Sequence, residues 1–215
     1  MGYAHIVFDI DGTLLDTEDT MLRSLSRAVE ELQGRKMEVE ELRFAFGITS
    51  EDAVKQLGIT NLQTAVKLWD TYIPDYWHLV HVFDGILECL EGLKNQGART
   101  GIITSKTREE YEREFVPFGL SGYFDTVICA DDSPRHKPYA DPMEAYLEKS
   151  KADRANVVYI GDSRYDMACA EAAGTACALA LWGCHHPEEI RADYYLDSPA
   201  KITALLYDSD SPFRL

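Results

Sequence analysis

The chain has 215 residues, a length that fits one domain or one domain with an insertion. Its composition is 46% hydrophobic, 27% charged and 11% aromatic, which is typical of a globular protein rather than a disordered or collagen-like one. The formal net charge of −16 argues against nucleic-acid binding and against attachment to an anionic membrane, since both need concentrated positive charge. An anionic substrate would therefore require a metal ion or a well-placed lysine.

Targeting and redox features point to the cytosol. No apolar run approaches the roughly 20 residues of a membrane-spanning helix. The N-terminus lacks the basic start and long apolar stretch of a signal peptide. The five cysteines are scattered and form no Cys-x-x-Cys pair, which indicates free thiols in a reducing compartment. We therefore predict a cytoplasmic protein.

Short β-rich runs alternate along the chain with helical patterns, which is typical of a parallel α/β sheet. The centre of each run is almost continuously apolar, as expected of strands buried on both faces. Asp141-Pro142 and Ser198-Pro199 are each predicted as the N-cap and first residue of a helix. The five predicted strands are Ala4–Phe8, Arg99–Thr104, Thr126–Ala130, Asn156–Ile160 and Ala176–Leu181.

Residues 17–82 interrupt this alternation and show no convincing strand. Thr49, followed three residues later by Asp52, resembles a helix N-cap. Apolar residues recur at helical spacing, as in Leu22, Leu25, Val29 and Leu32, and again in Leu62, Val66, Trp69 and Ile73. We therefore predict an all-helical insertion over 17–82, with residues 1–16 and 83–215 forming one α/β unit.

Two carboxylates leave the carboxyl end of the first predicted strand, in the segment Asp9-Ile10-Asp11-Gly12. Ligands bind at that end of open α/β sheets. Neighbouring carboxylates repel, and without a cation one tends to stay protonated. One can therefore act as a nucleophile and a Mg²⁺ ligand, and the other as an acid that protonates a leaving group. Gly12 lets the backbone turn sharply beside a ligand.

A second carboxylate pair follows the fourth predicted strand, where Asp162 is followed four residues later by Asp166. The ends of neighbouring parallel strands lie together, so Asp9 and Asp162 could share one cation. The alternative is that Asp162 and Asp166 only cap the next helix, a role that suits Asp. The local sequence leaves both interpretations open.

Hydroxyl groups and a lysine complete the pattern. Thr104 and Ser105 stand at the end of the second predicted strand, where a hydroxyl and free backbone N–H groups can cradle a phosphate. Lys137 lies between the third and fourth strands and could hold a phosphoryl oxygen beside the carboxylates. The alternatives are that Ser105 or Thr107 is an N-cap and that Lys137 is an ordinary surface lysine.

Taken in order, these motifs resemble the haloacid dehalogenase-like hydrolases, specifically phosphoglycolate-phosphatase-like members with a helical cap after the first strand. The matching segments are residues 9–17 (Asp-Ile-Asp-Gly-Thr-Leu-Leu-Asp-Thr) and 161–174, with Thr104 and Lys137-Pro138 in the right order between them. The resemblance covers nearly the whole chain. It implies a three-layer Rossmann-like core with five parallel strands, in the order 5-4-1-2-3, plus an all-helical cap. The chain departs from many relatives at Ala140, where they carry a second proline.

The resemblance also implies the chemistry. Asp9 would attack a phosphoryl group and become a phosphoaspartate. Asp11 would protonate the leaving oxygen and then deprotonate the water that hydrolyses the intermediate. Mg²⁺ would be held by Asp9, the backbone carbonyl of Asp11 and Asp162. Asp166 would orient Lys137 or a metal-bound water.

The phosphoryl group itself would be held by Thr104 and Lys137, helped by backbone N–H groups around Gly12 and Ser105. Positive charge on the equatorial oxygens is the main requirement of phosphoryl transfer. The implied function is a Mg²⁺-dependent phosphatase for a small phosphorylated metabolite, most simply a phosphoglycolate-like phosphomonoester. Neither a nucleic acid nor a membrane is expected as a partner, and the protein could be a monomer or a homodimer.

Three other functions remain as alternatives. A phosphomutase resembling β-phosphoglucomutase would carry a His early in the cap, but the matching position is Met21 and no His lies between His5 and His78. A dehalogenase would not need Asp11. A binding or regulatory module that had lost turnover would show a substitution at Asp9, Asp11, Lys137 or Asp162, and none is present.

The sequence leaves the substrate open among phosphoglycolate, a sugar phosphate, a nucleoside monophosphate and pyrophosphate. The segment Gly47–Ser50 could face the site through its backbone. Basic residues of the cap are candidates for a second substrate anchor, although most are expected to be solvated: Arg23, Arg27, Arg35, Lys36, Arg43, Lys55 and Lys67.

Other polar segments are predicted to have no catalytic role. Cys184-His185-His186 lacks a distant partner pair with metal-ligand spacing and is predicted to be a loop. His136 is predicted to be exposed, and Asp131-Asp132 to form a solvated turn. Residues 208–215 are predicted to be a frayed polar tail.

Overall fold

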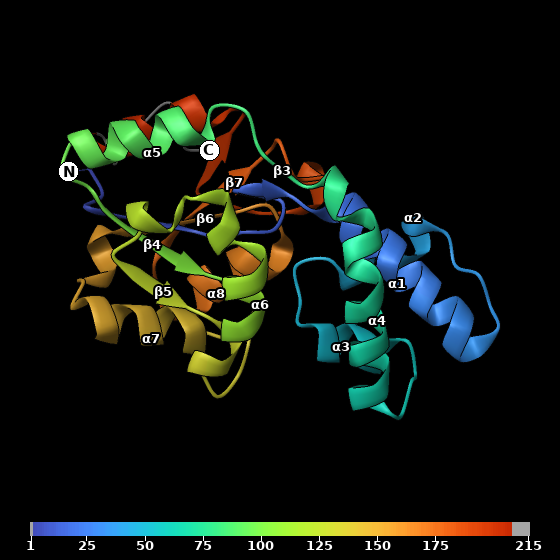
Figure 1. Cartoon of the computed structure of the whole chain (residues 1–215). Helices are drawn as coiled ribbons and strands as arrows, with labels where there is room; N and C mark the ends of the chain where they lie inside the picture. Colours follow the sequence, from blue (N-terminus) through green and yellow to red (C-terminus); the bar gives the residue numbers. More distant parts are fainter. Residues whose placement is uncertain (1, 208–215) are drawn as a thin grey trace.

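The computed structural model describes residues 2–207, so the predicted tail at 208–215 lies outside the described residues. A helical unit stands beside a larger α/β unit in which helices cover both faces of a sheet (Figure 1). We call the helical unit, residues 17–82, the cap and the α/β unit the core, with the boundaries predicted from the sequence. The α/β class with a parallel sheet is confirmed.

The core sheet has six parallel strands in the order β5-β4-β1-β6-β7-β8. The prediction of five strands was therefore wrong by one, although the predicted order of those five is found. The extra strand is β8 at one edge, with Tyr194 paired to Ala178 of β7. The strands are β1 His5–Phe8, β4 Arg99–Ile103, β5 Thr126–Ile128, β6 Val157–Gly161, β7 Ala176–Ala180 and β8 Tyr194–Leu196.

A small antiparallel pair connects the core to the cap. β2 (Leu15–Asp16) precedes the cap and pairs with β3 (His81–Val82) at its end. The expectation that residues 17–82 contain no strand was wrong for β3, a two-residue strand that exists only through this long-range pairing. The pair holds the two chain crossings between cap and core side by side.

Eight α-helices complete the described fold, four in each unit. The cap has α1 Glu18–Gln33, α2 Val39–Leu42, α3 Ser50–Gln56 and α4 Leu62–Tyr76. The core has α5 Ile86–Asn95, α6 Arg108–Glu114, α7 Asp141–Ser150 and α8 Arg164–Ala173. The short 3₁₀ helices are η1 Arg43–Ala45, η2 Trp77–Leu79, η3 Val116–Phe118, η4 Ser121–Tyr123, η5 Ala130–Asp132, η6 Arg154–Asn156, η7 Pro187–Glu189 and η8 Pro199–Leu206.

The sheet is buried on both faces. Along β1, Ile6 and Phe8 pack with α5, α6 and η8, whereas Val7 packs with α7 and α8 on the opposite face. All three side chains have no exposed surface. Burial of each such side chain contributes about 1.5–3 kcal/mol relative to exposure. This packing fixes the strand ends from which the polar side chains emerge.

The cap has an apolar core of its own. Leu22, Leu25 and Val29 of α1 pack against Trp69 and Ile73 of α4, and each is at most 5% exposed. These are the residues whose helical spacing predicted the two helices. The side chain of Thr49 accepts a hydrogen bond from the backbone N–H of Asp52, as its spacing predicted, and begins α3.

Two predicted helix starts differ in detail. Asp141 is the first residue of α7 rather than its N-cap, which is Ala140. Pro199 begins η8, a 3₁₀ helix, and Ser198 makes no side-chain cap bond to it. Both prolines still lie in the first turn, where the missing N–H costs nothing.

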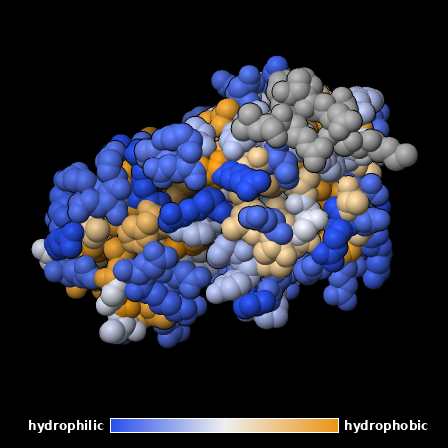
Figure 2. All heavy atoms as spheres, turned by 180° about the vertical axis from the view of Figure 1, so that it is seen from behind, coloured by the Kyte–Doolittle hydropathy of each residue, from blue (hydrophilic) through white to orange (hydrophobic). Residues whose placement is uncertain are grey.

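The surface is largely hydrophilic, with hydrophobic residues in separate patches on the face shown in Figure 2. This agrees with the composition and the net charge of −16. Within residues 2–207, no helix is both long and apolar enough to cross a bilayer.

Candidate active site

The residues that the sequence singled out follow neighbouring strands of the sheet. Asp9 comes directly after β1, Thr104 after β4 and Asp162 after β6, and β1 lies between the other two. Lys137 reaches the same edge from the loop between β5 and α7. Its Nζ lies 2.8 Å from Asp9 Oδ2, across 128 residues of sequence. The structure therefore gathers these side chains at the carboxyl edge of the sheet.

Lys137 connects two buried carboxylates. Besides Asp9, its Nζ donates to Asp166 Oδ1 at 2.7 Å, and its side chain is 1% exposed. Asp166 Oδ1 also accepts from the Tyr159 hydroxyl, while Oδ2 accepts from the backbone N–H of Ser163 and caps α8. The two interpretations of Asp166, helix cap and partner of Lys137, therefore both hold, one for each oxygen. Lys137 is not a surface lysine.

Asp162 lies against the turn that follows β1. Its Oδ1 accepts a hydrogen bond from Thr13 Oγ1 at 3.2 Å. Gly12 has a φ of +75°, and a Cβ there would lie 2.4 Å from Asp162 Oδ2. Any larger residue would displace the carboxylate, so glycine is required by this close approach. The backbone N–H of Gly12 donates to Leu15 O and is not free.

The three buried carboxylates fit a divalent cation. Asp9, Asp162 and Asp166 each offer an oxygen within 4.8 Å of the others, and Lys137 is the ammonium that pairs with this group among the described residues. Burial raises the pKa of Asp9 to about 8, and repulsion from Asp166 and Asp11 adds to it, whereas Lys137 opposes it. Burial, with repulsion from Asp166 and Asp9, also raises the pKa of Asp162 well above its usual value. An oxygen-seeking cation such as Mg²⁺ would remove this excess of buried negative charge.

Asp11 points to a different set of partners. Its Oδ1 accepts from Thr17 Oγ1 at 2.7 Å and lies 3.1 Å from Lys106 Nζ. Thr17 is the last residue before α1, so the first residue of the cap touches Asp11 directly. Asp9 and Asp11 therefore differ in environment: the first is enclosed by the core, and the second lies at the junction with the cap.

A chain of charged side chains runs from Asp11 to the cap, and we call it the Lys106 relay. Lys106 is 5% exposed, and its Nζ lies 2.6 Å from Glu114 Oε2. Glu114 Oε1 lies 2.5 Å from Arg113, whose Nη2 is 3.5 Å from Asp70 Oδ1 on α4. Burial works to raise the pKa of Glu114, but attraction to Lys106 and Arg113 outweighs it and holds that pKa below its usual value.

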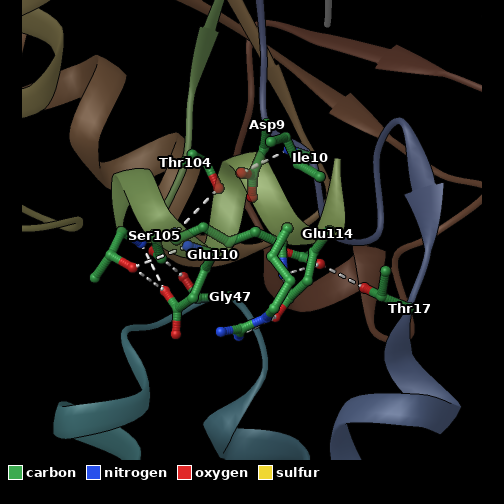
Figure 3. Close-up of polar contacts among 12 residues, drawn as sticks. Asp9, Ile10, Thr17, Gly47, Thr104, Ser105, Glu110 and Glu114 are labelled. Carbon is green, nitrogen blue, oxygen red and sulfur yellow. Dashed lines mark hydrogen bonds and ion pairs between the residues drawn. The ribbon is translucent and has the colours of Figure 1, made fainter. Parts of the chain in front are cut away.

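No role was predicted for Lys106 or Glu114 from the sequence. Lys106 follows Thr104-Ser105 directly, and its position beside two hydroxyl residues at a strand end was the one available signal. Glu114 showed no such signal in the sequence, because its contact with Lys106 depends on how α6 is oriented in the fold. Figure 3 shows Glu114 reaching toward this site from the helix behind it.

The cap closes over the site through a backbone contact. Ser105 Oγ donates to the carbonyl oxygen of Gly47 at 3.0 Å, so the predicted approach of residues 47–50 to the site is present (Figure 3). Asp9 and Thr104, which follow the paired strands β1 and β4, are both drawn above this segment in the same figure. Thr104 is 3% exposed, and its Oγ1 accepts from the backbone N–H of Lys106.

The space enclosed at Asp9 is small. The cavity between cap and core has a volume of about 30 Å³, roughly the space of one water molecule. We call it the inner cavity. Its lining comprises Asp9, Asp11, Met21, Ala45, Phe46, Gly47, Ile48, Ser50, Trp69, Ser105, Lys106 and Glu110.

Residues 184–186 form a loop, as predicted, and Asp131-Asp132 are exposed but belong to the 3₁₀ helix η5. His185 pairs with Glu18 of α1 in a loop contact between core and cap. His186, Glu188 and Glu189 form an exposed group that could also hold a metal ion, and His186 and Glu189 line one cavity with Asp162. Asp132 pairs with Arg108 on the surface. His136 differs from the prediction, because it is half-buried and its Nδ1 has no hydrogen-bond partner among the described residues.

Comparison with known proteins decides the family. Residues 6–180 match the haloacid dehalogenase-like hydrolases. The chain belongs to this family. It is 28% identical over 214 residues to the "Putative pyrophosphatase PpaX" of Caldanaerobacter subterraneus subsp. tengcongensis, covering 98% of this chain and 97% of that protein. It is 24% identical over 205 residues to the "Pyrophosphatase PpaX" of Bacillus mycoides, covering 94% and 95%.

Solved structures give the same result. The "putative phosphoglycolate phosphatase" of Lactobacillus plantarum superposes with a TM-score of 0.87 at 26% identity, over 95% of this chain and 100% of that one. The predicted membership in this family, the Rossmann-like core and the assignment as a hydrolase are therefore confirmed. These names, phosphatase and pyrophosphatase, agree with the predicted class of reaction and leave the substrate open.

Proposed function

We propose that the protein is a Mg²⁺-dependent phosphatase that hydrolyses a small phosphomonoester through a phosphoaspartate on Asp9. The observation that carries the proposal is the buried contact of Asp9 with Lys137 at 2.8 Å, at the same sheet edge as Asp162 and Thr104. A nucleophile, a fixed cation and a candidate metal site converge there on one small space.

In the first half of the reaction, Asp9 Oδ attacks phosphorus and the bond to the leaving oxygen breaks. Asp9 is 1% exposed, and one carboxylate oxygen is held by the backbone N–H of Ile10 at 2.7 Å. This hydrogen bond and Lys137 fix the carboxylate while water is excluded. Mg²⁺, held by Asp9, Asp162 and the Asp11 backbone carbonyl, would supply the positive charge that keeps Asp9 ionised and neutralises the phosphoryl oxygens.

Asp11 handles the proton in both halves. It would give a proton to the leaving oxygen and then take one from the water that attacks the phosphoaspartate, which regenerates Asp9 and releases phosphate. Thr17 and Lys106 hold its Oδ1, so its position depends on the start of the cap. Lys137 and the Thr104 hydroxyl would bind the transferring phosphoryl group, and Asp166 would hold Lys137 in place.

The phosphomutase alternative is not favoured. Met21 occupies the position where such a mutase would carry its histidine, and it lines the inner cavity. A thioether cannot transfer a proton. Phosphoglycolate is the phosphomonoester that the resemblance favours and is the reference substrate. The cytoplasmic location, and a monomeric or homodimeric state, remain predictions.

The test is phosphate release from phosphorylated metabolites and an aryl phosphate, with Mg²⁺ and with EDTA, for wild type and Asp9→Asn. We expect release that requires Mg²⁺ and falls by about three orders of magnitude or more in the variant, since a missing nucleophile removes the covalent route. Asp153→Asn, an exposed change in the core, is the control. Equal release by wild type and Asp9→Asn would exclude the proposal.

A further inference from the structure

A larger cavity opens beside the inner one, and we call it the outer cavity. Its volume is about 480 Å³, and it lies between the cap and the core. It shares Ser50, Ser105 and Glu110 with the lining of the inner cavity, so the two adjoin. A phosphoryl group held at Asp9 would direct its leaving group toward the cap side, where this space is available.

The charges around the outer cavity are negative. Glu51, Glu110 and Asp131 line it, and no described Lys or Arg does. Of these three, only Glu51 forms an ion pair among the described residues, with Lys55 at 3.4 Å. Glu110 instead accepts a hydrogen bond from the Thr107 backbone N–H, and Asp131 from that of Arg108. Neutral polar groups of Thr49, Ser50, Gln63, Ser105, Thr107 and His136 complete the polar lining.

The cations of the cap do not line these cavities, although Lys55 lies 3.4 Å from Glu51. Six of the seven basic residues that the sequence offered as substrate anchors are paired with acids of the cap itself, and none lines the inner or outer cavity. Typical are Arg27 with Asp75 at 2.5 Å and Arg35 with Glu41 at 3.2 Å, in which all four side chains are about half exposed. The six are Arg23, Arg27, Arg35, Lys36, Arg43 and Lys55.

The lysines at the inner site are already matched. Lys137 faces Asp9 and Asp166, and Lys106 faces Asp11 and Glu114. Neither has positive charge to spare for a second anion on the leaving group. The net charge of −16 adds a general repulsion of anions.

Resting on the proposed function, we infer that the substrates are phosphomonoesters whose leaving group carries a hydroxyl or an ammonium group rather than a second anion. Carboxylates in a cleft repel a carboxylate or phosphate on the substrate and attract an ammonium. The hydroxyl of Ser50 and the side-chain amide of Gln63, which also line the outer cavity, can hydrogen-bond such a group. Phosphoglycolate and pyrophosphate, despite the names of relatives, are disfavoured.

One other cavity could receive a leaving group. It measures about 320 Å³, lies beside Asp162 and contains Arg43 and Arg164. It shares only Phe46 with the lining of the inner cavity, against three residues for the outer cavity. Arg43 is bound there to Glu18 at 3.1 Å. A preference for anionic leaving groups would assign them to this cavity instead.

The experiment compares three phosphomonoesters of nearly equal size: phosphoethanolamine, 2-hydroxyethyl phosphate and phosphoglycolate. Their leaving groups end in an ammonium, a hydroxyl and a carboxylate. We expect kcat/KM for the first two to exceed that for phosphoglycolate by about tenfold or more, equivalent to 1.4 kcal/mol. Added salt should narrow the gap between the ammonium and the carboxylate, because the difference is electrostatic. Pyrophosphate should rank with phosphoglycolate or below it.

Three cap variants locate the effect. Glu51→Gln removes a carboxylate of the outer cavity and should lower the ratio of phosphoethanolamine to phosphoglycolate turnover by about threefold. Glu40→Gln, which removes a similarly exposed cap carboxylate 3.5 Å from Arg43, should leave the ratio unchanged. Ser50→Lys, which adds a cation where the two cavities meet, should raise turnover of phosphoglycolate and pyrophosphate.

The outcomes separate the inference from the function on which it rests. If the aryl phosphate is hydrolysed in an Asp9-dependent way but phosphoglycolate or pyrophosphate leads the series, the inference alone is wrong. Equal rates within about threefold also overturn it. If neither the series nor the aryl phosphate is hydrolysed, the proposed function fails, and the substrate inference fails with it.

Discussion

The core and cap sides of the site are built in opposite ways. On the core side, buried charges meet directly: Lys137 Nζ lies within 3 Å of a carboxylate oxygen of both Asp9 and Asp166. On the cap side, the residues facing Asp9 are uncharged, as with Met21, Ile48 and the others of the inner cavity. Charged side chains of the cap instead form ion pairs with one another on its outer surface.

This difference separates two tasks. A buried charge cluster is costly unless every member is compensated, so it constrains the core residues and suits a fixed reaction centre. The cap wall of the inner cavity is uncharged and can change without such a cost, while the carboxylates that would select a leaving group line the adjoining outer cavity. The Lys106 relay is the exception, because its ion pairs extend from Asp11 on the core side to Asp70 on the cap.

The strongest test of the buried core cluster is Lys137→Met. Removing the ammonium leaves Asp9 and Asp166 buried without their cation, and breaking a buried pair costs about 3–5 kcal/mol. We expect the free energy of unfolding to fall by that amount, as measured by denaturant titration. Lys36→Met, on an exposed cap lysine, should change it by less than about 0.5 kcal/mol. A loss of similar size in both variants would show that Lys137 is not compensating buried charge.

A smaller effect is expected from Mg²⁺. Binding to the folded state alone should raise Tm by a few degrees at saturating metal, about 2–4 °C per kcal/mol for a chain of this size. Asp162→Asn should abolish that rise. Without metal, the variant should be at least as stable as wild type, because burial raises the pKa of Asp162 and makes its ionised form unfavourable.

Asp197→Asn, on an exposed core residue, is the matched control and should keep the full response to Mg²⁺. A Mg²⁺-induced rise in Tm that survives in Asp162→Asn would place the metal elsewhere.

The smallest effect concerns the end of the Lys106 relay. Burial raises the pKa of Asp70 to about 6, although Arg113 opposes it. The folded state therefore holds this proton more tightly than the unfolded state, so the ionised form weakens folding above about pH 6, and the deficit disappears toward pH 4. Asp70→Asn should be slightly more stable than wild type at about pH 7.5 and equal to it near pH 4. The effect is modest, because a third of the side chain is exposed.

Denaturant midpoints at the two pH values check this prediction. Asp75→Asn, also on α4 but paired with Arg27 at the surface, is the control and should not be more stable than wild type at about pH 7.5. A destabilisation by Asp70→Asn that grows with pH would show that its ion pair with Arg113 outweighs the burial.

The local hydrophobic pattern was enough to predict the main core strands. Their apolar runs are continuous, so the polar residues that follow them, such as Asp9 and Asp162, could be placed at one edge of the sheet. β8 was missed because it has only three residues and pairs with β7 alone at the edge. β3 was missed for the same reason, since two residues carry no periodic signal.

At the site, the sequence could not show which side chains meet, because those contacts join different elements of the chain. A lysine that is buried looks the same in sequence as one that is exposed, and Lys106 is buried only because Asp11 and Glu114 reach it from other elements. Which cap residues face Asp9 also depends on how α1 and α4 pack. The sequence therefore offered seven cap cations as substrate anchors, whereas the structure places none of them in the adjoining cavities.

A phosphoaspartate on Asp9 can be trapped by acid-quenched labelling of Asp11→Asn with an aryl phosphate that is radiolabelled in its phosphoryl group. An aryloxide leaves without a proton, so Asp9 should still be phosphorylated, but the water that hydrolyses the intermediate loses its base. We expect about one equivalent of label per chain to accumulate on the peptide that contains Asp9. Steady phosphate release without label, or label on another residue, would contradict it.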